Sequence, residues 1–250
     1  MLYWGGILLA LIFFVRHEVY QQRQITNLEY QVNFIQRELD KSSIEWDSEN
    51  FNYLAIGNSI TKHPINDYWW SECGMAASNP EKDFAHLIAS AQNAQFYAYN
   101  FSAWELMSHD RGETLSLLDG MLSANLDLVT VQLGENVSNT TTFESDFEEL
   151  ISYIQRRAPK AQIIVIGDFW DEHEKDDYKK TACSATNVEF ISLDGIKNLA
   201  EYQCGMGSIV YDDDGNEHVV EHSGVAKHPN DKAMKYIADK VIGVLKEQKD

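Results

Sequence analysis

Short apolar runs alternate with amphipathic stretches from residue 51 to the end of the chain. The runs are rich in Val, Ile, Leu, Tyr and Phe, and several lack the strict polar alternation of a half-solvated strand, as expected where both faces of a parallel sheet are covered. Strands are predicted at 51–56, 95–100, 126–133, 162–166 and 188–193, and helices at 81–91, 112–123, 143–157, 174–185 and 231–247. This alternation predicts an α/β domain, a three-layer α/β/α sandwich around a doubly wound, five-stranded parallel sheet of flavodoxin-like type.

The chain opens with an uncharged, almost wholly apolar run at residues 2–15. As a helix the run would measure roughly 21 Å, which is shorter than the ~30 Å hydrocarbon core of a bilayer and matches the apolar part of a signal peptide. No basic residue precedes the run, and no small-x-small cleavage site follows it. We therefore expect residues 1–16 to form an uncleaved membrane anchor with the main domain extracytoplasmic, and a cleaved signal is the alternative.

A second helical pattern lies within residues 17–46. Apolar residues recur there at spacings of three and four, at Ile25, Leu28, Val32, Ile35 and Leu39. This is the a/d seam of a little over two heptads. Two interpretations stand: a short coiled-coil stalk that forms a homodimer through residues 25–39, or an amphipathic helix packed on its own domain. The main domain is then expected at 47–250.

Composition narrows the possible partners. The chain has 20 Lys and Arg against 39 Asp and Glu, a formal charge of −19, which argues against a nucleic-acid partner because phosphate binding needs surplus positive charge. Neutral substrates, such as sugars and their esters, fit this balance better. Of three cysteines, Cys183 and Cys204 are the pair expected to form a disulfide outside the cytoplasm, and three reduced thiols are the alternative. No Cys or His spacing suits a metal, and we expect no cofactor.

Three polar motifs stand where predicted strands or helices end or begin. Gly57-Asn58-Ser59-Ile60-Thr61 follows the first strand, Gly134-Glu135-Asn136 follows the third, and His228-Pro229-Asn230 precedes the last helix. Active sites of doubly wound folds lie outside the carboxyl ends of the strands. The pattern therefore predicts that a serine, an asparagine and a histidine meet at that edge of the sheet.

In this order the three motifs resemble the SGNH/GDSL hydrolase family over residues 51 to 247. Its first block, GDS, matches Gly57-Asn58-Ser59 with Asn for Asp; its third, GxN, matches Gly134-Glu135-Asn136; its fifth ends in HPN, as at 228–230. The resemblance implies a serine esterase in which Ser59 is the nucleophile and His228 its base. It also implies an oxyanion hole built from the Ser59 N–H, the Asn136 side chain and a second-block backbone N–H near Glu105.

The sequence departs from the family pattern at two positions. The usual Asp three residues before the histidine is Val225, and Glu105 stands near the usual glycine of the second block. The missing acid leaves three alternatives: a Ser–His dyad oriented by a backbone carbonyl, an acid supplied by Asp168, Glu221 or Glu105, or a weakened or inactive site.

Aromatic and polar residues near the motifs are candidates for substrate contacts. The candidates are Asn58, Trp69, Trp70, Trp104, Glu135 and Trp170. The tryptophans either stack on sugar rings or pack over the core. The acidic run at 212–217 lacks the spacing of a calcium loop and predicts a β-hairpin turn. We expect an esterase that removes an O-acetyl group from a carbohydrate or envelope glycan. The alternatives are a membrane-associated O-acyltransferase acting on glycans and a non-catalytic interaction module.

Overall fold

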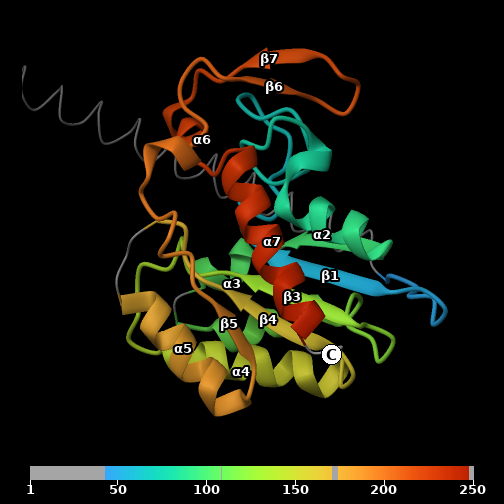
Figure 1. The fold of residues 1–250 in the computed structure, drawn as a ribbon. Coiled ribbons are helices and arrows are strands. Elements are labelled where there is room, and N and C mark those ends of the chain that lie inside the picture. Colours follow the sequence, from blue (N-terminus) through green and yellow to red (C-terminus); the bar gives the residue numbers. More distant parts are fainter. Residues whose placement is uncertain (1–42, 108, 171–173, 248–250) are drawn as a thin grey trace, which may run out of the picture. The chain divides into compact units, whose positions relative to one another are not determined.

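The computed structural model describes residues 43–107, 109–170 and 174–247. Five parallel strands form the central sheet in the order β2-β1-β3-β4-β5 (Figure 1). They are β1 (Asn52–Gly57), β2 (Gln95–Asn100), β3 (Leu128–Gln132), β4 (Gln162–Ile166) and β5 (Glu189–Ile191). The predicted doubly wound parallel sheet is confirmed. The predicted anchor and heptad seam lie outside the described residues.

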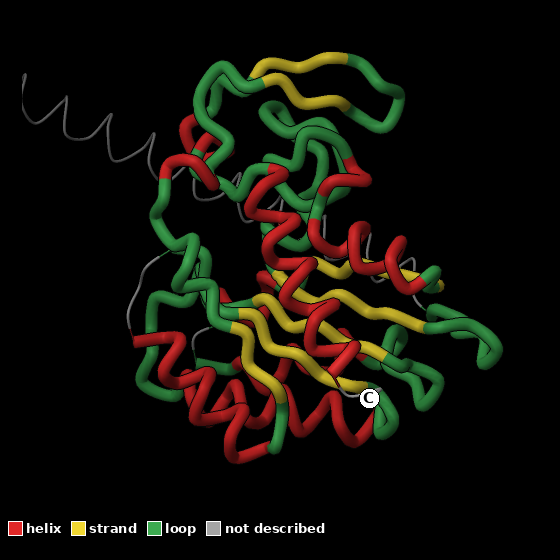
Figure 2. The backbone as a smooth tube through the Cα atoms, viewed as in Figure 1, coloured by secondary structure: helices red, strands yellow, loops and turns green. Residues whose placement is uncertain are grey.

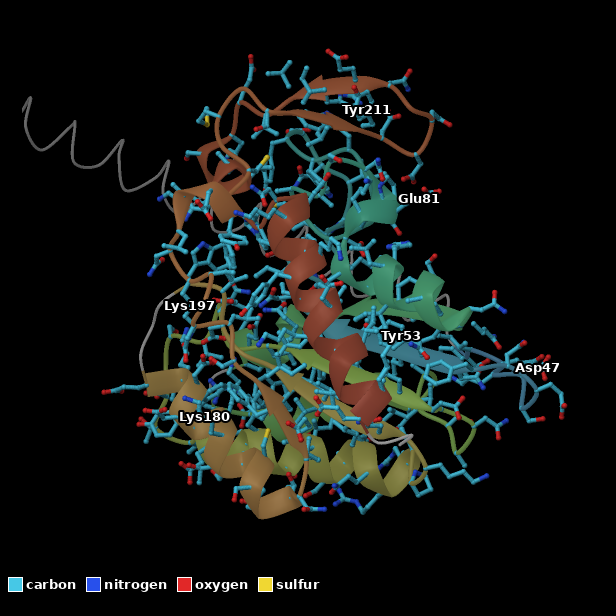
Figure 3. The ribbon with its side chains drawn as sticks, in the orientation of Figure 1. Asp47, Tyr53, Glu81, Lys180, Lys197 and Tyr211 are labelled. Atoms are coloured by element: carbon cyan, nitrogen blue, oxygen red, sulfur yellow. The ribbon has the colours of Figure 1, made fainter. Side chains whose placement is uncertain are left out.

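The sheet is covered on both faces because its strands are apolar on both. In β1, Leu54 and Ile56 enter one hydrophobic cluster, whereas Tyr53 and Ala55 enter another on the opposite face. Tyr53, which Figure 3 labels, lies fully buried, and its hydroxyl is 2.8 Å from Thr130 Oγ1 on the neighbouring strand β3. A strand buried on both faces explains the continuous apolar run in the sequence.

Helices form the outer layers (Figure 2). Residues of α2 (Phe84–Gln92) and α7 (Asp231–Glu247) pack in the cluster that contains Tyr53. Residues of α4 (Phe143–Arg157) and α5 (Glu174–Thr186) pack in the cluster that contains Leu54. The sequence predicted α4 and α7 at these same bounds, because their apolar residues repeat at helical spacing.

Other elements differ from the prediction. The stretch predicted as a helix at 112–123 is the 3₁₀ element η2 (Arg111–Leu118). Gly112, Thr114 and Ser116 within it are poor helix formers, which favours short 3₁₀ turns. The helix predicted at 81–91 divides into η1 (Pro80–Lys82) and α2. Three short elements of the described residues were not predicted: α3 (Ser102–Leu106), α6 (Ser223–Ala226) and η3 (Ala200–Tyr202).

A two-stranded hairpin covers the long loop between β1 and α2. Its antiparallel strands are β6 (Ile209–Tyr211) and β7 (Glu217–Val219), as the sequence predicted (Figure 1). The Asp212 carboxylate closes the turn by accepting the backbone N–H groups of Asp214 and Asn216 at 3.1 and 2.8 Å. Under the hairpin lies a third apolar cluster, which includes Trp69, Cys73, Met75, Val210, Val220 and Val225.

The cysteine pairing expected from the sequence is wrong. Cys73, Cys183 and Cys204 are all free thiols. Cys183 is buried in the cluster of α4 and α5, whereas Cys204 packs against the cluster under the hairpin, so the two belong to different parts of the core. Among the described residues, no helix has the length and apolar composition needed to cross a bilayer.

Candidate active site

The turn after β1 presents Ser59 at the carboxyl edge of the sheet. Gly57 ends the strand, and a Cβ there would lie 1.9 Å from Thr61 Oγ1 and 2.8 Å from the Gln132 carbonyl oxygen, so only glycine allows this turn. Asn58 is fully buried, and its Oδ1 accepts the Ile60 N–H at 3.1 Å. This Asx-type bond holds the turn, which leaves the half-buried Ser59 side chain at the edge.

His228 meets Ser59 from the loop before α7. Ser59 Oγ lies 2.9 Å from His228 Nε2, although the two residues are far apart in the chain. The next residues fix the loop, because Asn230 Oδ1 accepts the backbone N–H groups of Lys232 and Ala233, both at 3.1 Å, and so caps α7. The sequence therefore places the imidazole rigidly beside the hydroxyl.

A backbone carbonyl orients the histidine. His228 Nδ1 lies 2.8 Å from the Gly224 carbonyl oxygen. A carbonyl only accepts, so Nδ1 carries the hydrogen and Nε2 is left to accept the Ser59 hydroxyl proton. Burial is the main cause that lowers the pKa of His228 to about 4; the nearby His63 and His222 contribute to the lowering, and the bond to the Gly224 carbonyl opposes it. The imidazole is therefore neutral at pH 7 and can act as a base.

None of the acidic residues considered from the sequence is hydrogen-bonded to His228. Both of its ring nitrogens are already bonded, to Ser59 and Gly224. Asp168 Oδ1 instead pairs with the buried Lys179 ammonium at 2.6 Å, and Glu221 is exposed. Among the alternatives, the geometry matches the dyad with a backbone carbonyl.

Val225 occupies the position of the usual acid, with no exposed surface. Its side chain packs in the apolar cluster under the hairpin, with Trp69 and Val210. The residue at this position is therefore part of the hydrophobic core.

The Asn136 amide lies at the same edge, on the loop after β3, and the residue is exposed. Its Nδ2 donates to Glu105 Oε2 at 2.7 Å, which leaves the second Nδ2 hydrogen for another acceptor. Ser59 and Asn136 thus bring an N–H group and an amide to one edge. The third donor that the resemblance implies, the Glu105 backbone N–H, lies in α3, and its role stays a prediction.

The Glu105 carboxylate is buried, with 1% of the residue exposed, so it does not serve His228 or open into the site. Its Oε1 accepts the Gly134 N–H at 2.6 Å, the Asn136 N–H at 3.3 Å and Asn58 Nδ2 at 3.1 Å. Burial raises the pKa of Glu105, and these bonds oppose the rise.

Gly134 begins the loop that carries Asn136. Its φ is +134°, and a Cβ there would lie 2.6 Å from Asp168 Oδ1, so both its conformation and its surroundings require glycine. The Gly134 carbonyl oxygen accepts the Lys175 ammonium at 2.8 Å. Both backbone polar groups of Gly134, the N–H and the carbonyl oxygen, are therefore hydrogen-bonded.

Several candidate substrate contacts are wrong, because Asn58, Trp69 and Trp104 are buried, with at most 2% of each residue exposed. Trp70 stacks on the hairpin residue His218 with ring centroids 4.4 Å apart.

Two candidates remain near the site. Trp170 is half-buried, and its ring stands edge-on to His228 with centroids 4.9 Å apart. Glu135 is half-buried, and its Oε1 accepts the Phe169 N–H at 2.5 Å.

Sequence reasoning missed the pair Tyr68 and His222. Their rings stack with centroids 4.2 Å apart, and both residues are exposed. The His222 ring also contacts Gly224, because a Cβ on Gly224 would lie 2.9 Å from His222 Cε1. The pair thus adjoins the carbonyl that orients His228. No group of three or more His, Cys, Asp and Glu side chains within the described segments is arranged to hold a metal ion.

Solved structures share this fold. A GDSL-like lipase from Bacteroides ovatus superposes with a TM-score of 0.52 at 12% identity, over 79% of this chain and 99% of that one. A two-domain esterase active on acetylated mannans, crystallised with mannopentaose, superposes with a TM-score of 0.51 at 16% identity, over 80% of this chain and 50% of that one. No protein-family model and no curated protein sequence matches the chain. The protein has the SGNH/GDSL hydrolase fold.

Proposed function

We propose that the protein is a serine hydrolase that cleaves a carboxylic ester through an acyl-Ser59 intermediate. The observation that carries the proposal is the 2.9 Å contact between Ser59 Oγ and His228 Nε2, with the Nδ1 hydrogen held by a carbonyl. This tautomer is the one that a general base for a serine hydroxyl needs.

The reaction follows from the positions of these groups. As the Ser59 oxygen attacks the ester carbonyl, its proton passes to His228 Nε2, and the carbonyl oxygen becomes an oxyanion. The Ser59 N–H and the free Asn136 Nδ2 hydrogen stabilise that oxygen, a contribution of about 3–4 kcal/mol for one such donor. The imidazolium returns its proton to the departing alcohol, and water then releases the acyl group by the same two steps.

We assign the substrate as an O-acetyl group on a carbohydrate or envelope glycan. A chain of net charge −19 suits a neutral substrate. Near Ser59 and His228 lie the aromatic rings of Tyr68, His222 and Trp170. Aromatic faces of this kind stack on sugar rings. One structure of the same fold is that of an esterase active on acetylated mannans.

The test compares the full chain with two serine variants. We expect the wild type to hydrolyse p-nitrophenyl acetate, and Ser59→Ala to lose at least about 10³-fold in kcat, because the nucleophile is removed. Ser184→Ala, on the exposed face of α5, is the matched control and keeps the wild-type rate. A fluorophosphonate probe labels the wild type and the control alone. Equal hydrolysis by wild type and Ser59→Ala would refute the proposal.

The substrate class has its own measurement. Acetate release from acetylated manno-oligosaccharides is compared with release of longer acyl groups from the same sugars. Faster release of longer chains would contradict the acetyl assignment, while leaving the serine hydrolase proposal in place.

Membrane attachment through residues 1–16 is a separate part of the proposal, and it rests on the sequence alone. The full chain is expected in the membrane fraction after alkaline carbonate extraction. Leu9→Lys combined with Leu11→Lys introduces two charges into the apolar run and is expected to release the protein. A wild type that is extracted as readily as this double variant would contradict the anchor.

A further inference from the structure

Four hydrogen-bond donors face the buried carboxylate of Glu105. Its two oxygens accept Asn58 Nδ2, the Gly134 N–H, the Asn136 N–H and Asn136 Nδ2, at 2.6 to 3.3 Å. No hydrogen-bond acceptor faces the carboxyl group within the described part of the chain. A carboxylate with four donors and no acceptor matches the ionised form, which only accepts.

These donors belong to different parts of the site. Asn58 lies in the nucleophile turn directly before Ser59, whereas Gly134 and Asn136 lie on the loop that follows β3. The carboxylate therefore joins the turn that carries the hydroxyl to the loop that carries the amide. Without it, a side chain as exposed as Asn136 would have several rotamers open to it.

We propose that Glu105 is a positioning residue, and that its carboxylate fixes the Asn136 side chain so that one Nδ2 hydrogen points to the oxyanion. The inference rests on the proposed hydrolase function. The Nδ2 hydrogen bonded to Glu105 Oε2 sets the plane of the amide, and planarity then fixes the direction of the other hydrogen. The Glu105 carboxylate bonds only to these protein donors and touches neither substrate nor reacting atoms.

The residue pair at positions 58 and 105 is consistent with this role. The first block of the SGNH/GDSL pattern has Asp where this chain has Asn58, and its second block has glycine near Glu105. Here Asn58 is fully buried, and its Nδ2 donates to Glu105. An Asp at 58 would instead bury a second carboxylate about 3 Å from the first, where two like charges cannot both be ionised. The two departures from the pattern therefore belong together.

The experiment is a kinetic cycle on the full chain with Glu105→Gln, Asn136→Ala and the double variant. Gln has one acceptor oxygen, and its amide nitrogen would face a donor, so the Asn136 amide loses its anchor. We expect Glu105→Gln to lower kcat by about 10- to 100-fold with KM within about 3-fold, and Asn136→Ala to lower kcat by about 100-fold. The double variant should match Asn136→Ala within about 3-fold, because both changes remove one contribution.

Glu148→Gln is the matched control, since it makes the same chemical change on the exposed face of α4. It is expected to leave kcat and KM unchanged. If Glu105→Gln keeps kcat within 2-fold of the wild type, or if its loss multiplies fully with that of Asn136→Ala, the positioning role is overturned. In both cases wild-type turnover and Ser59 labelling still stand, so the hydrolase proposal survives.

A second measurement needs no turnover and no folded variant of Glu105. In the wild type, the side-chain amide signal of Asn136, assigned by its loss in Asn136→Ala, is followed by nuclear magnetic resonance during a pH titration. It should move with the same midpoint as the Glu105 carboxyl carbon. An amide signal that does not respond overturns the inference, even if the protein hydrolyses esters.

Discussion

The low pKa of His228 makes a quantitative prediction for the acid side of the pH profile. The imidazole is placed among apolar and aromatic groups, its Nδ1 partner is a neutral carbonyl, and two further histidines stand near it. Its pKa falls from the ordinary 6.5 to about 4. The lower pKa disfavours the charged form of His228 by roughly 3 kcal/mol.

The perturbation is a change of pH from 8 down to 4. The base must be neutral, so activity is present above the pKa of His228 and is lost as the pH falls through it. At pH 5.5 an ordinary histidine would be about 90% protonated, whereas a pKa of about 4 leaves roughly 3% protonated. We therefore expect kcat/KM at pH 5.5 to stay near its value at pH 7, instead of falling about tenfold.

The assay is kcat/KM for p-nitrophenyl acetate at each pH, since this ratio reports the pKa values of the free enzyme. Circular dichroism at each pH checks that the chain stays folded. Burial also raises the pKa of Glu105, so the profile is repeated with Glu105→Gln to separate the two groups. His222→Gln removes one of the positive charges that lower the pKa of His228, so its inflection should move to higher pH.

An inflection near pH 6.5 that persists in Glu105→Gln would refute the reasoning. It would mean that His228 is as well solvated as a free imidazole, or that a carboxylate pairs with it in solution. Either result would contradict the orientation by the Gly224 carbonyl oxygen.

Three further predictions concern stability. Val225→Asp should lower the free energy of unfolding, measured by urea denaturation, by about 3 kcal/mol or more, because it buries an unpaired charge in the apolar cluster. It should not raise kcat, because His228 Nδ1 is already bonded to the Gly224 carbonyl oxygen, and a gain in kcat would contradict this. Burial lowers the pKa of His63 to about 4, so between pH 6.5 and 4 only the unfolded chain binds a proton at this histidine, and the free energy of unfolding decreases by up to about 3 kcal/mol as the pH falls through that range. His63→Gln should flatten this pH dependence, and an unchanged slope would count against the reasoning. Lys179→Met should cost about 3–5 kcal/mol at pH 7, because it strips the buried partner from Asp168, and a loss below 1 kcal/mol in the same assay would be inconsistent with the buried pair.

The sequence predicted the sheet and its edge because both depend on local rules. Strands buried on two faces are continuous apolar runs, and parallel strands bring their carboxyl ends to one edge. Ser59 and Asn136 lie in the loops that follow such strands, and His228 precedes a well-patterned helix. Their meeting at one edge could therefore be predicted without knowledge of side-chain packing.

What the sequence did not predict depends on contacts between distant segments. Tyr68 and Trp69 are neighbours in one loop, yet one is exposed and the other is buried, because the hairpin from 209–219 covers the second. The Gly224 carbonyl that orients His228 is a backbone group, and any residue type supplies one. Only Glu105 had a usable signal: a carboxylate in place of the pattern's glycine, accompanied by Asn58 in place of its Asp.

A histidine with a low pKa changes the balance between the two proton transfers of ester cleavage. Taking the Ser59 proton is harder by up to roughly 3 kcal/mol, because His228 is a weaker base than a free imidazole. Its imidazolium is correspondingly a stronger acid, so it returns the proton more readily to a departing alkoxide. An aryl ester, whose leaving group needs no proton, bears only the cost of the first step. A sugar acetate, whose alkoxide does need one, recovers part of that cost in the second. The site should therefore discriminate less between sugar acetates and aryl acetates than a site whose histidine is paired with a carboxylate.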